Sequence, residues 1–382
     1  TFADQAVIAI ENVRLFNETQ ESLQQQKASA EVLAVISNSM ADAQPVFEKI
    51  LDSCKHLFGG DELDVLLVDE QGMLDIAAYR GVAHDIVAAT FPAPVERTPA
   101  GRALRERRVM HWPDLIDGED VPGVLRKMAK LIGYRSMVFA PMLWNERGIG
   151  AIGVARSTGP FKPKELAMVQ TFADQAVIAI QNARLFNETK AALERQTATA
   201  EVLQVISSSV ADAQPVFERI IQSCRRLLRS TFADIGLIGE DGLMHLALIE
   251  DVGTEEEQAR TRRLKAEFPR PVRQSIHGYA IHKRRAVHIA DVLNGAEVPQ
   301  GLRKTAELGG NYSGIWAPMF WEGKGIGAIG VVRMPPAPFD DEEIELLKTF
   351  ADQAVIAIQN AKMFKETQEA RAAAEAANEA KS

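Results

Sequence analysis

Cysteines and long apolar runs are both scarce in this sequence. Only two cysteines, Cys54 and Cys224, occur in 382 residues, which argues against a disulfide framework and is typical of a reducing compartment. No run of eighteen or more uncharged apolar residues is present, so we expect no membrane-spanning helix within this segment. We expect no signal peptide either. Together these absences predict a cytoplasmic protein.

An excess of basic residues is also lacking. The 43 Lys and Arg residues stand against 52 Asp and Glu residues, which gives a net charge of −9, and the basic residues are dispersed along the chain. This distribution argues against nucleic acid as a partner. The apolar content of 46% and the charged content of 25% are those of an ordinary globular protein with a packed core.

Motifs for catalysis and for cofactor binding are not recognisable. The pattern GIGAIG at 148–153 and 325–330 matches GxGxxG, but a dinucleotide site needs that motif between a strand and a helix. Here the glycines fall inside an apolar strand pattern, where glycine more often marks close packing. No Ser/His/Asp or Cys/His arrangement and no paired carboxylates stand out. We therefore predict no catalytic residue, no metal and no cofactor in this segment, and the identity of any small-molecule ligand stays open.

A repeat organises the whole chain. The motif TFADQAVIAI recurs with similar flanks at 1–19, 171–189 and 349–367, and the phrases ADAQPVFE, APM and GIGAIGV each occur twice. A period near 175 residues is too long for a solenoid, so the units are duplicated whole domains. The spacing predicts about seven extra residues in the second copy, as a longer loop or helix at 254–267. The leading motif is expected to be the tail of a preceding copy, in a chain cut from a longer polypeptide.

The apolar pattern of one copy predicts an α+β domain. We expect helices at 28–39, 44–58, 99–108 and 121–132, and a long helix from about 164. We expect strands at 64–69, 73–79, 109–111, 136–143 and 148–156, of which the first two and the last two form hairpins. This order predicts one central antiparallel sheet, with helices in the crossover and at both ends.

The layout and its local phrases resemble the GAF family. The segments 101–111 and 278–288, followed by Asp114 and Asp291, look like the helix, strand and loop over a GAF pocket, and the APM and GIGAIGV phrases look like the last two strands. The resemblance implies a small-ligand site between the sheet and the crossover helices. Its candidate residues are Arg102, His111, Asp114 and Phe139 in the first copy, and His277, His282, His288, Asp291 and Trp316 in the second copy.

Each of these candidates has a structural alternative. His111 and His288 are also expected at strand ends, where they would bond loop backbone. A metal or haem site in the second copy would need converging ligands, and His277 and His282, five residues apart, share a helical face poorly. The pocket cysteines of bilin-binding and methionine-sulfoxide-reducing relatives are lacking, as is the NKFDE-type signature of cyclic-nucleotide binders. Cys54 and Cys224 instead match each other on the buried face of the second helix.

The predicted boundaries follow from the repeat. We expect a tail helix of a preceding GAF domain with a signalling helix over 1–40, a first GAF domain over 41–186 and a connecting helix over 187–210. A second GAF domain is expected over 211–364, followed by a helical linker over 365–382 that leads to an output domain.

The long helices predict a parallel coiled-coil homodimer. Small and aromatic residues recur at heptad spacing before polar residues take over, and the predicted seam consists of Phe172, Ala176, Ala179, Ala183, Phe186 and Leu193. The alternative is a surface helix that packs only on its own domain.

The Ala- and Glu-rich ending at 367–382 resembles the linker that enters the dimerisation and phosphoacceptor domain of sensor histidine kinases. The resemblance implies a sensory and dimerising module of a two-component phosphorelay. Two alternatives stay open. One is the regulatory region of a nucleotide cyclase or phosphodiesterase, and the other is a scaffold that binds no ligand.

Overall fold

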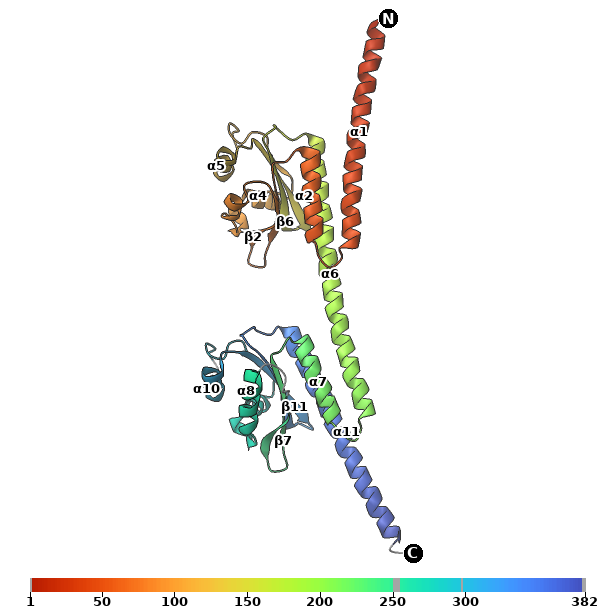
Figure 1. The fold of residues 1–382 in the computed structure, drawn as a ribbon, viewed down its shortest axis with the longest axis vertical. Coiled ribbons are helices and arrows are strands. Elements are labelled where there is room, and N and C mark those ends of the chain that lie inside the picture. Colours follow the sequence, from red (N-terminus) through yellow and green to blue (C-terminus); the bar gives the residue numbers. More distant parts are fainter. Residues whose placement is uncertain (1, 250–254, 297, 380–382) are drawn as a thin grey trace. The chain divides into compact units, whose positions relative to one another are not determined.

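The computed structural model describes residues 2–249, 255–296 and 298–379 (Figure 1). The chain forms two compact units, Thr1–Lys190 and Ala191–Ser382, which are called the first and the second domain below. Each is described by itself.

The first domain begins with two helices and then builds its sheet. Its elements are α1 (Phe2–Asn38), α2 (Gln44–Phe58), β1 (Glu62–Val68), β2 (Met73–Arg80), α3 (His84–Ala88), β3 (Ala93–Pro94), η1 (Val95–Arg97), α4 (Pro99–Glu106), β4 (Met110–Trp112), α5 (Gly123–Ile132), β5 (Ser136–Trp144), β6 (Arg147–Arg156) and the first part of α6 (Pro163–Ser208).

The second domain repeats this order. After the remainder of α6 come α7 (Gln214–Leu227), β7 (Phe232–Ile238), β8 (Leu243–Ile249), α8 (Glu255–Ala266), β9 (Arg270–Pro271), η2 (Val272–Gln274), α9 (Ile276–Lys283), β10 (Val287–Ile289), α10 (Gln300–Gly309), β11 (Ser313–Trp321), β12 (Lys324–Arg333) and α11 (Asp341–Glu379).

Each domain holds one six-stranded sheet. The strand order is β3-β2-β1-β6-β5-β4 in the first domain and β10-β11-β12-β7-β8-β9 in the second, which is the same order read from the other edge. All the described strand pairs are antiparallel. The predicted α+β class and central antiparallel sheet are therefore confirmed.

Helices cover both faces of each sheet, which gives three layers. In Figure 1, α2 and α6 lie on one face of the first sheet, with α4 and α5 on the other. Because successive strand residues point to opposite faces, Leu63 and Val65 of β1 join the core under the long helices, whereas Leu66 joins the core under α4 and α5. We call these two sides the long-helix face and the crossover face.

The long-helix face buries the repeated motif. Phe172 and Phe350, at matching positions of α6 and α11, are both fully buried. Phe2 occupies the same motif position near the start of α1 and is 93% exposed. The burial of this motif therefore depends on a sheet of its own beneath it.

The crossover helices are fixed by matching caps. Thr98 and Ser275 each accept a hydrogen bond from a backbone N–H of the first helical turn, Gly101 and Gly278, at 3.0 Å. A Cβ on either glycine would lie only 1.8 Å from a backbone carbonyl oxygen of the preceding turn. Glycine is thus required where α4 and α9 begin, because only glycine allows this close approach.

The predicted elements agree with the structure in kind. The sequence pattern missed α3 and β3, which are too short to show a period. The helix expected at 28–39 is the last part of α1, which is continuous over 37 residues and falls within the helical segment expected over 1–40. The extra residues of the second copy fall in α8, which has 12 residues where α3 has five. That extension was predicted, and the predicted range 254–267 includes residue 254, which lies outside the described residues.

The long helix α6 runs for 46 residues and passes Ala200, as predicted. Four residues of the predicted dimer seam, however, are buried within the first domain: Phe172, Ala176, Ala179 and Ala183 are at most 9% exposed. The physical reason is that the helix needs this side to cover its own sheet. Of the predicted seam, only Phe186 and Leu193 are exposed, at 43% and 61%.

An exposed apolar row lies beside the buried side of each helix. On α6 it contains Ile178, Leu185 and Phe186, and on α11 it contains Ile356, Met363 and Phe364. Their exposed fractions match closely in sequence order, at 47, 58 and 43% against 46, 57 and 40%. Ile178 and Leu185 are seven residues apart, as are Ile356 and Met363, which is the spacing of a helix–helix seam. We call these two rows the outer stripes.

Among the described residues, no helix combines the length and the apolar character needed to cross a membrane.

Candidate functional site

A buried carboxylate lies at the centre of the crossover face in both domains. Asp64 of β1 and Asp234 of β7 are 7% and 3% exposed. Both strands are apolar around the aspartate, so neither position is a solvated strand residue. Burial of a carboxylate costs free energy unless a partner or a proton neutralises it. The two domains meet this requirement differently.

The first domain surrounds Asp64 with apolar and acidic groups. Its Oδ1 has no hydrogen-bond partner among the described residues. Burial raises the pKa of Asp64 to about 7, the backbone N–H of Gly153 opposes this rise, and the nearby Glu62 adds to it. Glu62 itself accepts hydrogen bonds from the Tyr79 hydroxyl and from the backbone N–H of Val82. Asp64 is therefore largely protonated below neutral pH.

The second domain gives the carboxylate a partner. Nε2 of His277, on α9, lies 2.7 Å from Oδ2 of Asp234, and both side chains are less than 5% exposed. The contact is at ion-pair distance, but its two atoms do not have hydrogen-bond geometry. The His277 ring also meets Phe268 edge-on, with ring centroids 6.3 Å apart. Trp316 covers the other side of the carboxylate, because a Cβ placed on Gly330 would touch both Asp234 Oδ1 and Trp316 Nε1.

A second cluster joins β4, the strand that follows α4, to the start of α6, the helix that leaves the domain. Met110 and Trp112 of β4 belong to the core of the crossover face, so His111 between them points to the long-helix face, where Phe161 is buried. His111, on β4, accepts a hydrogen bond at Nε2 from the backbone N–H of Phe161, at 3.3 Å, and the two rings meet edge-on. Burial lowers the pKa of His111, and the charge of Arg156 lowers it further. The ring is therefore neutral at pH 7, and its acceptor role at Nε2 places the proton on Nδ1.

Arg156 connects this cluster to the start of α6. Its guanidinium lies 4.0 Å from the centroid of the Phe161 ring. It donates to the backbone carbonyls of Phe58, Gly159 and Pro160 and pairs with Glu165 in the first turn of α6 at 3.0 Å. One side chain thus ties together the end of α2, the β6–α6 turn and the start of α6.

The second domain repeats this junction. Nε2 of His288 accepts from the N–H of Phe339 at 3.2 Å, and Arg333 lies 4.0 Å from the centroid of the Phe339 ring. Arg333 donates to the carbonyls of Leu228 and Pro338 and pairs with Glu343. We call each such set of His, Phe, Arg and Glu side chains a junction.

The sequence-predicted site residues fall into three groups. Phe139, His277 and Trp316 lie around the buried carboxylates, and His111 and His288 belong to the junctions. Both histidines bond loop backbone, which was the structural alternative. The remaining four shape the surface: Arg102 pairs with Glu106 and Asp120, Asp114 and Asp291 cap the turns after β4 and β10, and His282 is exposed on α9.

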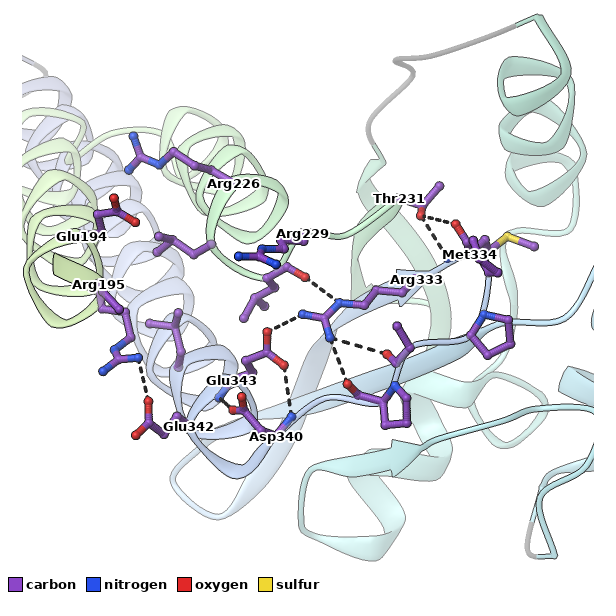
Figure 2. Close-up of a pocket in the computed structure, with 18 residues that line it drawn as sticks. Glu194, Arg195, Arg226, Arg229, Thr231, Arg333, Met334, Asp340, Glu342 and Glu343 are labelled. Carbon is purple, nitrogen blue, oxygen red and sulfur yellow. Dashed lines mark hydrogen bonds and ion pairs between the residues drawn. The ribbon is translucent and has the colours of Figure 1, made fainter. Parts of the chain in front are cut away.

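A surface cavity of about 830 Å³ opens in the second domain (Figure 2). It is bounded by the end of α7, the β12–α11 segment, the start of α11 and residues 191–195 of α6. Arg333 lies in its wall, and Arg195 pairs with Glu342 at 2.7 Å. Four arginines and four acidic residues line it, so their charges balance. None of the nine predicted ligand residues lines this cavity.

Sequence reasoning missed Asp64, Asp234, Arg156 and Arg333. The signal that could have found them is the repeat itself. A lone aspartate stands in the same apolar strand of both copies, and an arginine follows the last strand phrase in both. A charged residue placed identically inside two apolar segments is a candidate for a buried, partnered role.

Comparison with known proteins decides the family. Residues 42–180 and residues 210–359 each match a family described as GAF domain. The chain belongs to the GAF domain family. It carries two GAF domains in tandem, the type of module that serves as a sensor in signal transduction.

Three solved bacterial structures are similar to parts of the chain. A GAF/HD domain protein from Geobacter sulfurreducens shares 21% identity, with 39% of this chain and 98% of that chain covered and a TM-score of 0.34. A domain of a putative two-component sensor histidine kinase from Sinorhizobium meliloti shares 21%, with 38% and 95% covered and a TM-score of 0.32. A bacteriophytochrome from R. palustris shares 12%, with 86% and 75% covered and a TM-score of 0.47.

The junction makes a testable prediction about Arg156. In the Arg156→Ala variant, Glu165 loses its buried partner and three carbonyls lose their donor, so we expect a loss of about 3 kcal/mol in the stability of the first turns of α6. Hydrogen exchange of peptides from α6 and β6 measures this loss. The control is Arg184→Ala, which removes an exposed pair with Glu188 and should cost about 0.5 kcal/mol or less. Equal effects of the two substitutions would show that Arg156 does not hold the helix.

Proposed function

We propose that the chain is a sensory and dimerising module that relays a signal through α6 and α11 to an output domain of the same protein. The observation that carries this proposal is the junction. In both GAF domains it joins the strand that follows the crossover helix to the first turn of the outgoing helix. A change on the crossover face therefore has a short physical route to the helix that leaves the domain.

The relay needs a state in which the junction is rearranged. A signal that favours another position of α4 or α9 would move β4 or β10 and with it His111 or His288. The Phe ring and the Arg–Glu pair then shift the first turn of the helix. A signal can bias the helices only as far as its affinities for the two arrangements differ.

The outer stripes supply the surface for a parallel homodimer. Each stripe is an exposed apolar row on a helix whose opposite side is already buried against its own sheet. Because the two GAF domains expose the same three positions to the same degree, two chains in parallel would meet stripe to stripe. Such a weak helical seam can hold two arrangements of similar free energy, which a dimeric output domain would read.

The output that we propose is a two-component histidine kinase in the cytoplasm, controlled by phosphorelay. The Ala- and Glu-rich end of α11 supports it by its resemblance to the linkers of that class. The cysteines Cys54 and Cys224 are buried thiols rather than a disulfide, which fits a reducing compartment. A chain that included a phosphoacceptor histidine and incorporated phosphate from ATP would satisfy this part of the proposal. A cyclase or phosphodiesterase activity would contradict it.

The dimer is tested by charges placed in the outer stripes. Light scattering of the wild-type chain should give twice the chain mass. The variant with Leu185→Glu and Met363→Glu should give the mass of one chain, because each glutamate would be buried against its symmetry mate. The matched control carries Arg184→Glu and Lys362→Glu, at exposed, equivalent positions on another face of the helices, and should stay dimeric. A monomeric wild type, or a dimer that survives the stripe variant, contradicts the proposal.

The relay is tested by cross-linking. Single cysteines placed along 186–197 report which faces of two paired helices meet. We expect the pattern of disulfide cross-links to change when Arg156→Ala releases the start of α6, and to stay unchanged with Arg184→Ala. An identical pattern in both backgrounds would mean that the junction does not control the helix pairing.

A further inference from the structure

The two GAF domains fill the space beside their buried carboxylates with different pairs of residues. In the first domain, Leu66 of β1 and Ala100 of α4 are both buried on the crossover face. The matching positions in the second domain hold Gly236 and His277. A Cβ on Gly236 would lie 3.0 Å from the His277 ring and 2.9 Å from Met244 Sδ. The imidazole therefore occupies the space that a leucine side chain fills in the first domain.

This difference in residues decides whether a histidine lies beside the carboxylate. Where the strand residue is glycine, a histidine reaches Asp234 at 2.7 Å. In the first domain the strand residue is Leu66, and Ala100 at the helix position has no imidazole that could pair with Asp64. The residues that α4 buries on this face are Ala100, Gly101, Ala103 and Leu104, none of which carries a charge. No cation thus approaches Asp64 from the helix above it.

The other elements around Asp64 also disfavour its ionised form. From β6 comes Gly153, over which the Asp64 carboxylate and the Phe139 ring lie together, since a Cβ there would touch both. Tyr79 is its neighbour on β2, and Glu62 lies two residues before it on β1. The charge of Asp64 also contributes to a raised pKa of Tyr134, which precedes β5. An ionised Asp64 would be a buried charge next to a second carboxylate, whereas the protonated acid is neutral.

We propose that Asp64 is a proton-binding site through which the first GAF domain senses pH, and that the second domain lacks this response because His277 pairs with the equivalent carboxylate. The inference rests on the proposed sensory role and names a proton as the signal. Loss of the proton leaves an unpaired charge between the sheet and α4, which loosens the packing of α4 on the sheet. Gain of the proton restores the packing.

The direction of the pH effect follows from linkage. Because the pKa of Asp64 in the folded domain is raised to about 7, the folded state binds a proton that the unfolded state has already released above pH of about 4. Stability of the first domain therefore falls as pH rises from about 4 to about 7, and is flat above that range. Asn at this position imitates the neutral acid and should abolish the fall.

The test follows the Asp64 carboxyl in the full chain. Aspartate labelled with ¹³C at the side-chain carboxyl is titrated by NMR, and the signal missing from Asp64→Asn identifies the group. We expect a midpoint near 7. Hydrogen exchange of the β1 and α4 peptides, corrected for intrinsic rates, should show an opening constant about 30-fold larger at pH 8 than at pH 5.5. In Asp64→Asn the same ratio should stay within about twofold.

Two further variants separate this site from its counterpart. Asp234→Asn should leave the titration near 7 in place. The pair Leu66→Gly with Ala100→His should supply the missing imidazole and lower the midpoint, and if that pair does not fold, the Asp64→Asn comparison still decides. A midpoint below about 5, or the same pH response of exchange in Asp64→Asn, overturns the proposal. Either result leaves the dimer mass and the cross-linking pattern unchanged, so the relay itself is judged separately.

Discussion

A guanidinium at the end of the last strand, buried in the first domain and half-buried in the second, is the interaction on which each domain depends. Arg156 and Arg333 each satisfy backbone carbonyls from a helix end and from a turn, and each pairs with a glutamate in the first turn of the outgoing helix. Without a donor, those carbonyls would be left unpaired away from water. Because one planar group serves several acceptors, the end of the sheet and the start of the helix have a fixed relation.

Each sheet has two faces with different contents, the long-helix face and the crossover face. The long-helix face buries the repeated motif of α6 or α11 and carries most of the apolar core. The crossover face holds a buried carboxyl group at its centre and is covered by short helices. The junction histidine lies on a strand whose neighbouring residues are buried on the crossover face, while its own ring contacts the turn that enters α6 or α11. A single strand thus carries residues of the crossover core and the histidine that contacts the start of the long helix.

Much of this fold could be predicted from the sequence, since the repeat and the apolar periods locate every long element and the continuous α6. The short α3 and β3 were beyond such reasoning because they have no period to detect. Four residues of the predicted seam are buried against the first domain's own sheet. The sequence could not show this, because both sides of that stretch are apolar and pattern alone does not say which side meets the sheet. Asp64 and Arg156 were missed because their roles depend on distant residues: Arg156 bonds Phe58, which is 98 residues away.

A double-mutant cycle between His111 and Arg156 tests the junction most directly. The two side chains meet across the Phe161 ring, so their effects on the opening free energy of the first turns of α6, measured by hydrogen exchange, should not add. We predict a coupling of about 1 kcal/mol or more between His111→Ala and Arg156→Ala. The same cycle between His111→Ala and Arg184→Ala should show none. If the first pair were additive within about 0.3 kcal/mol, the crossover face and the outgoing helix would be independent, and the account would be contradicted.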